Sequence, residues 1–377
     1  MISTTGQKVA FIATSTAIGG MERVMADVAR RLAADGVAID IWLSPNIGEQ
    51  ETVAWFGARG VSARAHPAVP DIHQPRSWRS VLEFARFVSS LRVDTVNLHY
   101  GVGHISLKDV LAVRLAGRRC VVTVHAASGW GADDEPARRA TRRAAALCGR
   151  VIVHSQAARA HLLAAGVSPA EIVCIPCGVE PPMRIPSQME ARAKLGAPQD
   201  AFVISAAARM VPEKGLDTLL EAMSDLRSLP TPIYLLIAGA GPDEIRLRGM
   251  GAALLGDRAR FLGHLPDLSD VYAASDLFVL PSHMEGFGLV YLEAALHGVP
   301  SIGTNVGAIP EVIQDGVTGL LVPPRDSKAL AAAIRSLIGD PKRIQAMGQA
   351  AKRRALADFG MDRMGEDYRR ALLGQRS

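Results

Sequence analysis

Glu285 and Glu293 are the residues whose type and spacing point most clearly to chemistry. A strand pattern, a glycine-containing turn and a helical pattern follow one another here, so Glu285 lies in the loop. Glu293 lies about one turn inside the helix, on the order of 6 Å along its axis. One carboxylate can therefore reach the reacting group of a ligand and the other a separate pair of hydroxyl groups. The spacing alone favours a helix cap and a solvated glutamate, but the strand and the turn reverse that preference.

The turn itself offers a binding site made of backbone groups. Its two glycines let a ligand approach the main chain closely. The first N–H groups of the following helix are free to bind an anion or a hydroxyl oxygen. The candidate binding residues of this turn are Gly286, Phe287, Gly288 and Leu289.

Two cationic side chains, Arg209 and Lys214, fall in one loop between a predicted strand and a predicted helix. Together they could neutralise a diphosphate leaving group. A salt bridge to Glu213, or plain solvation, explains the same residues, and this alternative stays open. The sequence contains no Asp-x-Asp pair. It therefore predicts no carboxylate clamp for Mg²⁺ or Mn²⁺ and no metal site.

Weaker candidates lie in the first half of the chain. Gly19 and Gly20 follow the first predicted strand, and such a pair before a helix can let backbone N–H groups touch phosphate. The pair does not complete the Gly-x-Gly-x-x-Gly dinucleotide pattern, and a plain turn explains it as well. His125 ends another predicted strand, where it can bind a ligand hydroxyl or relay a proton. A purely structural histidine is the alternative.

These candidates need a scaffold that brings the ends of several strands together. Apolar runs alternate with helical patterns along the chain, which is typical of parallel sheets covered by helices on both faces. The proline-dense stretch 181–186 interrupts this alternation, because it can continue neither a helix nor a central strand. The sequence therefore predicts an α/β protein of two doubly wound parallel-sheet domains. Because such sheets bind ligands beyond the carboxyl ends of their strands, the expected site is a cleft that the two domains face.

The predicted strands are 8–14, 37–43, 95–99, 120–125, 151–154 and 172–175 in the first half, then 201–207, 233–238, 259–262, 277–280, 300–303 and 320–322 in the second.

Composition is consistent with two domains, since 377 residues with 49% hydrophobic content suffice for two cores. No apolar run reaches the roughly 18 residues that a membrane span needs. The short run 9–13 lacks the length of a secretory signal, and we interpret it as a buried strand. Cys174 and Cys177 have the spacing of a metal or redox pair, but no second pair accompanies them. We expect buried, reduced thiols.

The net charge of +5 is carried by the first half of the chain. Segment 76–92 places Trp78, Leu82, Ala85 and Leu91 among arginines, and a second basic cluster consists of Arg138, Arg139, Arg142 and Arg143. Basic amphipathic helices can lie on anionic bilayers, so an anionic membrane surface is a candidate partner. The solvated outer face of an ordinary helix is the alternative. No motif for nucleic-acid binding occurs, and we expect no nucleic-acid partner.

Taken together, these segments resemble family 4 of the retaining glycosyltransferases, which have the GT-B fold. The segment from Glu285 to Glu293 is similar to the family's E-x7-E motif, and Arg209 and Lys214 fall on its basic pair. Residues 175–179, Ile-Pro-Cys-Gly-Val, resemble its segment at the interdomain edge. Residues 238–242 and 261–265 resemble its loops on the side of the base.

The resemblance implies a role for each candidate in the second half. The donor would be a nucleotide-diphosphate sugar and the acceptor a glycan or a lipid-linked sugar, with no cofactor and no metal. Glu285 would contact the transferred sugar and Glu293 the ribose. Arg209 and Lys214 would hold the diphosphate. Two further residues, His264 and Leu265, would touch the base.

The resemblance also assigns the domains. Residues 1–180 would form the acceptor-side domain, 181–355 the domain that binds the nucleotide sugar, and 356–377 a helix packing back towards the first domain. Gly19 and Gly20 would approach the diphosphate from the first domain, and His125 would lie near the donor sugar and the acceptor.

Two other functions are compatible with the same architecture. A nucleotide-sugar 2-epimerase would convert a donor without any acceptor, and a non-catalytic partner subunit of a glycosyltransferase would bind without turnover. The arrangement of Glu285 and Glu293 favours transfer over epimerisation, and the presence of Glu285 and Lys214 favours an active enzyme. We expect a cytoplasmic protein, peripheral on the inner face of the membrane if the basic segments bind lipid.

Overall fold

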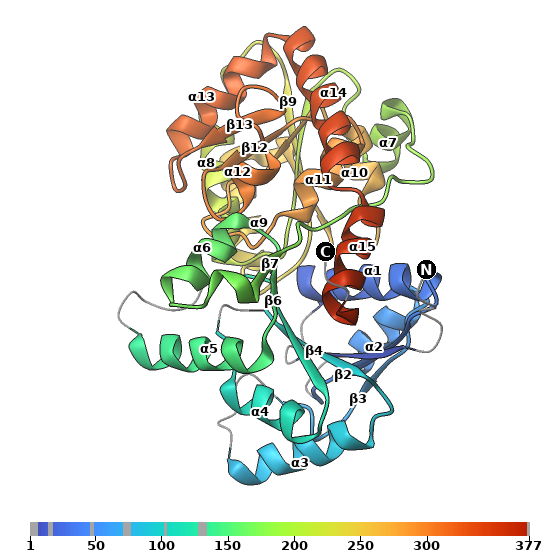
Figure 1. Ribbon diagram of the computed structural model, residues 1–377. Coiled ribbons are helices and arrows are strands. Elements are labelled where there is room, and N and C mark those ends of the chain that lie inside the picture. Colours follow the sequence, from blue (N-terminus) through green and yellow to red (C-terminus); the bar gives the residue numbers. More distant parts are fainter. Residues whose placement is uncertain are drawn as a thin grey trace. The chain divides into compact units, whose positions relative to one another are not determined.

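The computed structural model describes residues 7–13, 18–45, 49–70, 77–101, 104–126 and 134–374 (Figure 1). The chain divides into two compact units. The first unit comprises Met1–Gly178 and Met361–Ser377, and the second comprises Val179–Gly360. Each unit contains one parallel sheet with helices on both sides, which confirms the predicted class of two doubly wound α/β domains.

The first sheet has seven parallel strands in the order β3-β2-β1-β4-β5-β6-β7. The strand order reverses between β1 and β4, and this is the point where open parallel sheets form ligand sites. The strands are β1 (Lys8–Ala13), β2 (Ala38–Leu43), β3 (Ala63–Ala65), β4 (Thr95–Tyr100), β5 (Arg119–Val124), β6 (Val151–Val153) and β7 (Ile172–Cys174).

The helices of the first unit begin at recognisable caps. The Ser77 hydroxyl accepts the Ser80 N–H before α3, and the Asp134 carboxylate accepts the Ala137 N–H before α5. The helices are α1 (Gly20–Ala34), α2 (Glu49–Gly57), α3 (Trp78–Ser90), α4 (Leu107–Leu115), α5 (Glu135–Cys148), α6 (Gln156–Ala164), the short η1 (Pro169–Glu171) and α15 (Met361–Leu373).

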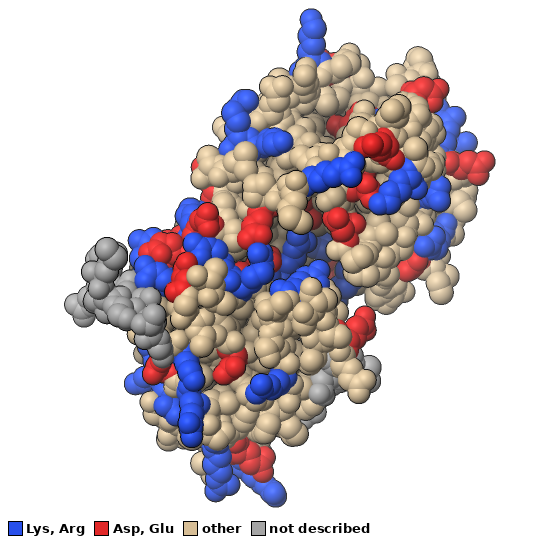
Figure 2. Space-filling model, turned by 90° about the vertical axis from the view of Figure 1, so that its right-hand side faces the viewer, with Lys and Arg blue, Asp and Glu red and all other residues tan. Residues whose placement is uncertain are grey.

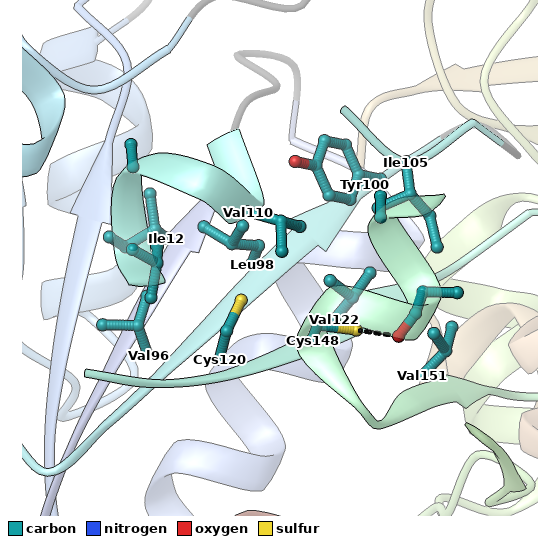
Figure 3. Packing of buried hydrophobic residues seen from close by; sticks show 14 of the residues in the cluster. Ile12, Val96, Leu98, Tyr100, Ile105, Val110, Cys120, Val122, Cys148 and Val151 are labelled. Atoms are coloured by element: carbon teal, nitrogen blue, oxygen red, sulfur yellow. Dashed lines mark hydrogen bonds between the residues drawn. The ribbon is translucent and has the colours of Figure 1, made fainter. Parts of the chain in front are cut away.

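One face of the first sheet forms an apolar core. Alternate residues of the strands, among them Ile12, Leu98 and Val122, pack there against the buried sides of α3, α4 and α5 (Figure 3). Cys120 and Cys148 belong to this core, and burial raises the pKa of the Cys148 thiol to about 12. All four cysteines of the chain are free thiols; Cys177 is buried as expected, whereas Cys174 is only half-buried.

The last helix, α15, completes the first unit on the other face of the sheet. Its apolar residues Met364, Tyr368 and Leu372 are fully buried. Arg119 and Arg150 donate to carbonyl oxygens at its carboxyl end, where cations are favourable. An ion pair between Arg31 and Asp362 joins it to α1. Acidic and basic side chains are intermixed on the face shown in Figure 2.

The second sheet has six strands in the order β10-β9-β8-β11-β12-β13, and all pairs are parallel. Its strands are β8 (Phe202–Ala207), β9 (Ile233–Ala238), β10 (Ala259–Gly263), β11 (Leu277–Val279), β12 (Ser301–Thr304) and β13 (Gly319–Val322).

Helices cover the second sheet on both faces: α8 packs against α9 and α13, α11 against α14, and α7 against α10. They are α7 (Gln188–Leu195), α8 (Leu216–Asp225), α9 (Glu244–Leu255), α10 (Ser269–Ala274), α11 (Leu289–Leu296), α12 (Ile309–Val312), α13 (Ser327–Ile338) and α14 (Pro341–Asp358), with the short η2 (Pro212–Lys214) and η3 (Gly256–Arg258).

Each strand expected from the sequence is present, with ends that shift by at most one residue. Thr14, the expected end of the first strand, lies outside the described residues. The sequence analysis missed β3, because three residues at a sheet edge carry too short an apolar pattern to be recognised.

The apolar residues named in segment 76–92 divide between two sides of α3. Ala85 and Leu91 are buried and pack inward, whereas Trp78 and Leu82 are 64% and 51% exposed. The four residues therefore do not form one outward apolar face, because Ala85 and Leu91 belong to the side that covers the sheet. Arg76 lies outside the described residues. No described helix has the length and apolar character needed to cross a membrane.

Candidate functional site

Lys214 and Glu285 meet in the second unit at the carboxyl ends of β8 and β11. Lys214 Nζ lies 2.8 Å from Glu285 Oε2, and the Glu285 side chain is only 10% exposed. The Ser282 hydroxyl donates to the same carboxylate oxygen at 3.2 Å. The neighbouring Glu213 is therefore not the acidic partner of Lys214. The two loops together hold one ammonium and one carboxylate in a fixed pair.

Backbone contacts tie these two loops together. The N–H groups of His283 and Met284 both donate to the carbonyl oxygen of Glu213, at 2.8 and 3.3 Å. Gly215 has a φ of 63°, and a Cβ there would lie 2.2 Å from the Pro281 carbonyl oxygen. Only glycine fits this position. The main chain is therefore held in place in both of the loops that carry Lys214 and Glu285.

Arg209 lies on the same loop as Lys214 but in a different environment. Its side chain is exposed, and no described residue forms an ion pair or hydrogen bond with its guanidinium. The β8–α8 loop thus presents one cation that is already paired and one that is available to an anion.

Glu293 lies on α11, as expected, and is 8% exposed. The Tyr272 hydroxyl donates to Glu293 Oε2 at 2.7 Å. Glu285 and Glu293 therefore have different partners. The sequence analysis did not find Tyr272 or Ser282, since neither residue type is a signal by itself.

The turn before α11 has the expected form. Gly286 is half-buried, Phe287 is buried against Phe359, and α11 begins at Leu289 after Gly288. The main chain of this turn can bind a ligand, whereas the Phe287 ring serves packing. His264 and Leu265 follow β10, and the Gly239 N–H donates to the Gly263 carbonyl oxygen beside them at 2.7 Å.

In the first unit, Gly19 and Gly20 begin α1 as predicted. The Gly19 N–H is occupied, because it donates to the Glu22 carboxylate at 2.9 Å within a capping box. Glu22 is 2% exposed and places a carboxylate at the helix start. The bond from Gly19 was not expected from the sequence, although the Glu three positions later is the usual signal for it.

His125 follows β5 and is half-buried. His125 Nε2 lies 2.9 Å from His99 Nδ1, and its ring lies 4.9 Å from the ring of His154. Burial and the two neighbouring histidines lower the pKa of His125 well below its usual value. Among the described residues, no group of three or more His, Cys, Asp or Glu side chains is arranged to hold a metal ion.

Comparison with known proteins agrees with this architecture. The family model "Glycosyltransferase Family 4" matches residues 18–181, and "Glycosyl transferases group 1" matches residues 187–354. A D-inositol 3-phosphate glycosyltransferase of Catenulispora acidiphila is 30% identical, over 95% of this chain and 92% of the relative. A GDP-mannose-dependent phosphatidylinositol monomannoside mannosyltransferase of Mycolicibacterium smegmatis is 32% identical, over 72% of this chain and 74% of the relative.

A solved structure extends the comparison to the fold. Anabaena HepE in complex with UDP and glucose has a TM-score of 0.81 at 22% identity, over 96% of this chain and 98% of that chain. Two doubly wound units with this likeness define a glycosyltransferase of the GT-B fold. The chain belongs to the glycosyltransferase family that the two matching models describe.

Proposed function

We propose that this glycosyltransferase moves a sugar from a nucleotide-diphosphate donor with retention of anomeric configuration and without a metal ion. The contact between Lys214 Nζ and Glu285 Oε2, with Arg209 exposed on the same loop, is the observation that carries the proposal. Glu285 binds hydroxyl groups of the transferred sugar, and Glu293 binds the ribose. Arg209 and Lys214 take up the charge of the departing diphosphate.

Retention follows from attack on the face that the leaving group vacates. The bond from the anomeric carbon to the diphosphate oxygen breaks, and that oxygen accepts the proton of the acceptor hydroxyl. The new glycosidic bond forms on the same face. The N–H groups that start α11 add to the stabilisation of the developing negative charge.

The proposal is tested with Arg209→Ala and Lys214→Ala, assayed with donor and acceptor after treatment with a chelator. Each variant should lose at least about 100-fold in kcat, the loss typical of removing one fixed group that stabilises transition-state charge. The control is Arg248→Ala, because Arg248 pairs with Glu244 on α9. Near-normal turnover of both variants, or an inverted anomeric carbon by NMR of the product, contradicts the proposal.

For the donor and the acceptor we propose a chemical class and no individual compound. The relatives named above use D-inositol 3-phosphate or a phosphatidylinositol mannoside according to their names, and one depends on GDP-mannose. We propose a glycan or lipid-linked acceptor for this chain too. Thermal-shift screening of nucleotide sugars identifies the donor, since a ligand at 100 times its Kd stabilises the folded state by about 2.7 kcal/mol.

A lipid-linked acceptor places the enzyme at a bilayer, and α3 offers a surface for it. Trp78 and Leu82 project from α3, Arg79 and Arg86 are exposed beside them, and Lys108 Nζ lies 5.8 Å from the centroid of the Trp78 ring. Exposed apolar side chains flanked by cations suit an anionic bilayer surface. We propose that this surface holds a cytoplasmic enzyme peripherally on the inner face of the membrane.

Flotation with vesicles of phosphatidylcholine and phosphatidylglycerol tests this surface. Wild type should float at low salt, and Trp78→Ser with Leu82→Ser should not. The matched control is Leu115→Ser, because Leu115 is equally exposed but lies on α4. Binding that is insensitive to salt, or equal in all variants, rejects the proposed surface.

A further inference from the structure

One face of the first sheet carries a row of buried polar side chains. Central strands of parallel sheets are usually apolar on both faces. The neighbours of these residues on β4 and β5, such as Leu98 and Val122, do belong to the apolar core of Figure 3. Asn97, His99 and Thr123 point to the opposite face and are fully buried there. Burying polar groups is costly unless they are hydrogen-bonded, so this row calls for a functional explanation.

The row ends at His125, the one member that is only half-buried, at the carboxyl edge of the sheet. Its Nε2 is 2.9 Å from Nδ1 of His99, and the rings are stacked with centroids 5.2 Å apart. Burial lowers the pKa of His99 to about 3, and that of His125 is lowered as well. Both rings are therefore neutral near pH 7, so a single hydrogen lies between these two nitrogens.

His154 also lies beside His125 and has a fixed tautomer. Its Nδ1 lies 2.9 Å from the Ile175 carbonyl oxygen, which can only accept, so Nδ1 carries the hydrogen. Burial lowers the pKa of His154 to about 4, so near pH 7 its Nε2 is a bare acceptor. The Tyr368 hydroxyl of α15 lies 3.5 Å from that nitrogen. The neutral ring of His154 thus lies 4.9 Å from the ring of His125.

We propose that His99 is a positioning residue for His125: its Nδ1–H donates to Nε2 of His125, so that His125 keeps its own hydrogen on Nδ1 and offers it to the ligand. This inference rests on the proposed function, because a sugar diphosphate presents mainly acceptor oxygens to a nearby imidazole. The opposite direction of the bond would leave His125 with a lone pair on Nδ1, which could accept from a sugar hydroxyl but could not bind a diphosphate oxygen.

The arrangement also explains why His125 needs two buried neighbours. A lone imidazole exchanges its hydrogen between its two nitrogens and can take up a second proton. The bond from His99 holds the hydrogen on one nitrogen, and the neutral ring of His154 limits how far the His125 ring can rotate. His125 is thereby prepared before the ligand binds, which lowers the ordering cost at binding.

The position of the hydrogen is measured on the full chain labelled with ¹⁵N-histidine. In wild type the NMR shifts should assign a protonated Nδ1 and an unprotonated Nε2 to His125. In His99→Leu, which has no donor, the His125 shifts should move towards an exchanging mixture of tautomers. His99→Asn places an amide where Nδ1 was and should restore the wild-type pattern.

Kinetics supply the second measurement. His99→Leu should lower kcat at least about tenfold, while His99→Asn should stay within about threefold of wild type. The control is Cys120→Ala, a change at an equally buried residue on the apolar face, which should leave the His125 shifts unchanged. If His99→Leu fails to fold, wild type and His99→Asn still decide the question.

A hydrogen on Nε2 of His125 in wild type overturns the inference, and so does a His99→Leu spectrum identical to wild type. The NMR measurement needs neither donor nor acceptor. An absence of sugar transfer therefore rejects the proposed function alone, and a wrong tautomer rejects the role of His99 alone.

Discussion

Glu285 and Glu293 carry the same functional group in two different environments. Glu285 is paired with the ammonium of Lys214, a partner that a diphosphate can draw away. Glu293, which is buried on α11, accepts a hydrogen bond from the neutral Tyr272 hydroxyl of α10. A cationic partner for one carboxylate and a neutral partner for the other support our proposal that the two bind different parts of one ligand.

The bond from Tyr272 to Glu293 yields a prediction for stability and binding. Tyr272→Phe removes the donor from a carboxylate that is 8% exposed, and a hydrogen bond to a charged group contributes about 1.5–3 kcal/mol. Thermal unfolding should shift down by several degrees, and KM for the donor should rise. Tyr234→Phe is the control, because the Tyr234 hydroxyl has no hydrogen bond among the described residues. Equal shifts in both variants would contradict this account.

For single residues, the sequence indicated the acidic and basic side chains of the candidate site but not the partners of these side chains. The sequence offered Glu213 as the neighbour of Lys214, yet the ion pair is with Glu285, 71 positions away. Glu213 contributes its backbone carbonyl to the opposite loop instead. Contacts between the ends of non-consecutive strands depend on the strand order, which local spacing does not encode.

At the scale of helices, strands and loops, the loop after β12 packs closely against the loop that contains Glu285. Gly307 has a φ of 53°, and a Cβ there would lie 2.2 Å from the Glu285 carbonyl oxygen. Gly316 has a φ of 74° but has no atom within 4 Å of such a Cβ. The two glycines share the backbone conformation and differ only in the contact.

Replacing each of these two glycines by alanine distinguishes the energetic cost of the left-handed backbone from a disturbance of the Lys214–Glu285 site. Gly316→Ala should cost about 1–2 kcal/mol, the usual penalty for a left-handed alanine, and should keep its activity. Gly307→Ala should cost more and also lower kcat, because the clash displaces the Glu285 main chain and so disturbs the contact with Lys214. Unfolding midpoints and initial rates of both variants test this. The same loss of activity in both variants would show that the contact is irrelevant.

Helix α7 is held to the second sheet by a buried ion pair. Arg192 is 5% exposed, and its guanidinium lies 2.6 Å from Asp276 Oδ2 while also donating to the Ala274 carbonyl. Removing Arg192 leaves the carboxylate of Asp276, which is 24% exposed, without its cation, so the cost should lie at or below the about 3–5 kcal/mol typical of fully buried pairs. Arg192→Ala should therefore lower the unfolding midpoint strongly.

Lys194 on the same helix provides the control. It pairs with Asp270, but its side chain is 69% exposed, and exposed pairs contribute about 0–1 kcal/mol. Lys194→Ala should be nearly neutral in the same chemical denaturation experiment. A comparable loss in both variants would mean that the ion pair of Arg192 does not hold α7.

The fold was easier to predict than the site, for reasons visible in particular elements. The run Ile233–Ala238 is apolar on both faces, so it indicates a central parallel strand by itself. The edge strand β3 and the inward side of α3 have no such unambiguous pattern. A short edge strand is defined by its pairing with β2, and the direction of a helix face by what it covers.

For the whole molecule, the first unit depends on both ends of the chain. Its last helix is α15, and the Tyr368 and Leu372 side chains are buried against strands that begin near residue 95. The polar row that ends at His125, and Tyr368 beside His154, therefore lie in a unit that is complete only with residues 361–373. Protonating a histidine in this core therefore lowers the free energy of unfolding of the entire unit.

Acid should destabilise this unit through its buried histidines. The pKa of His154 is lowered to about 4 and that of His99 to about 3, against about 6.5 for an unfolded chain. Between about pH 6.5 and 4 the unfolded chain binds protons that the folded unit does not, so the free energy of unfolding falls as the pH falls. Each pH unit between the folded and unfolded pKa values of His154 costs about 1.4 kcal/mol, so this residue alone accounts for a loss on the order of 3 kcal/mol.

The measurement is the free energy of unfolding by urea between about pH 7 and 4.5. His154→Asn keeps a donor for the Ile175 carbonyl but does not titrate, so its stability should fall less steeply with acid than that of wild type. The difference in slope near pH 5.5 should approach about 1.4 kcal/mol per pH unit, the value for one proton. Parallel curves for the two proteins would mean that His154 takes up its proton in the folded unit over the same pH range as in the unfolded chain. In that case its neutral contact with His125 and Tyr368 could not be maintained.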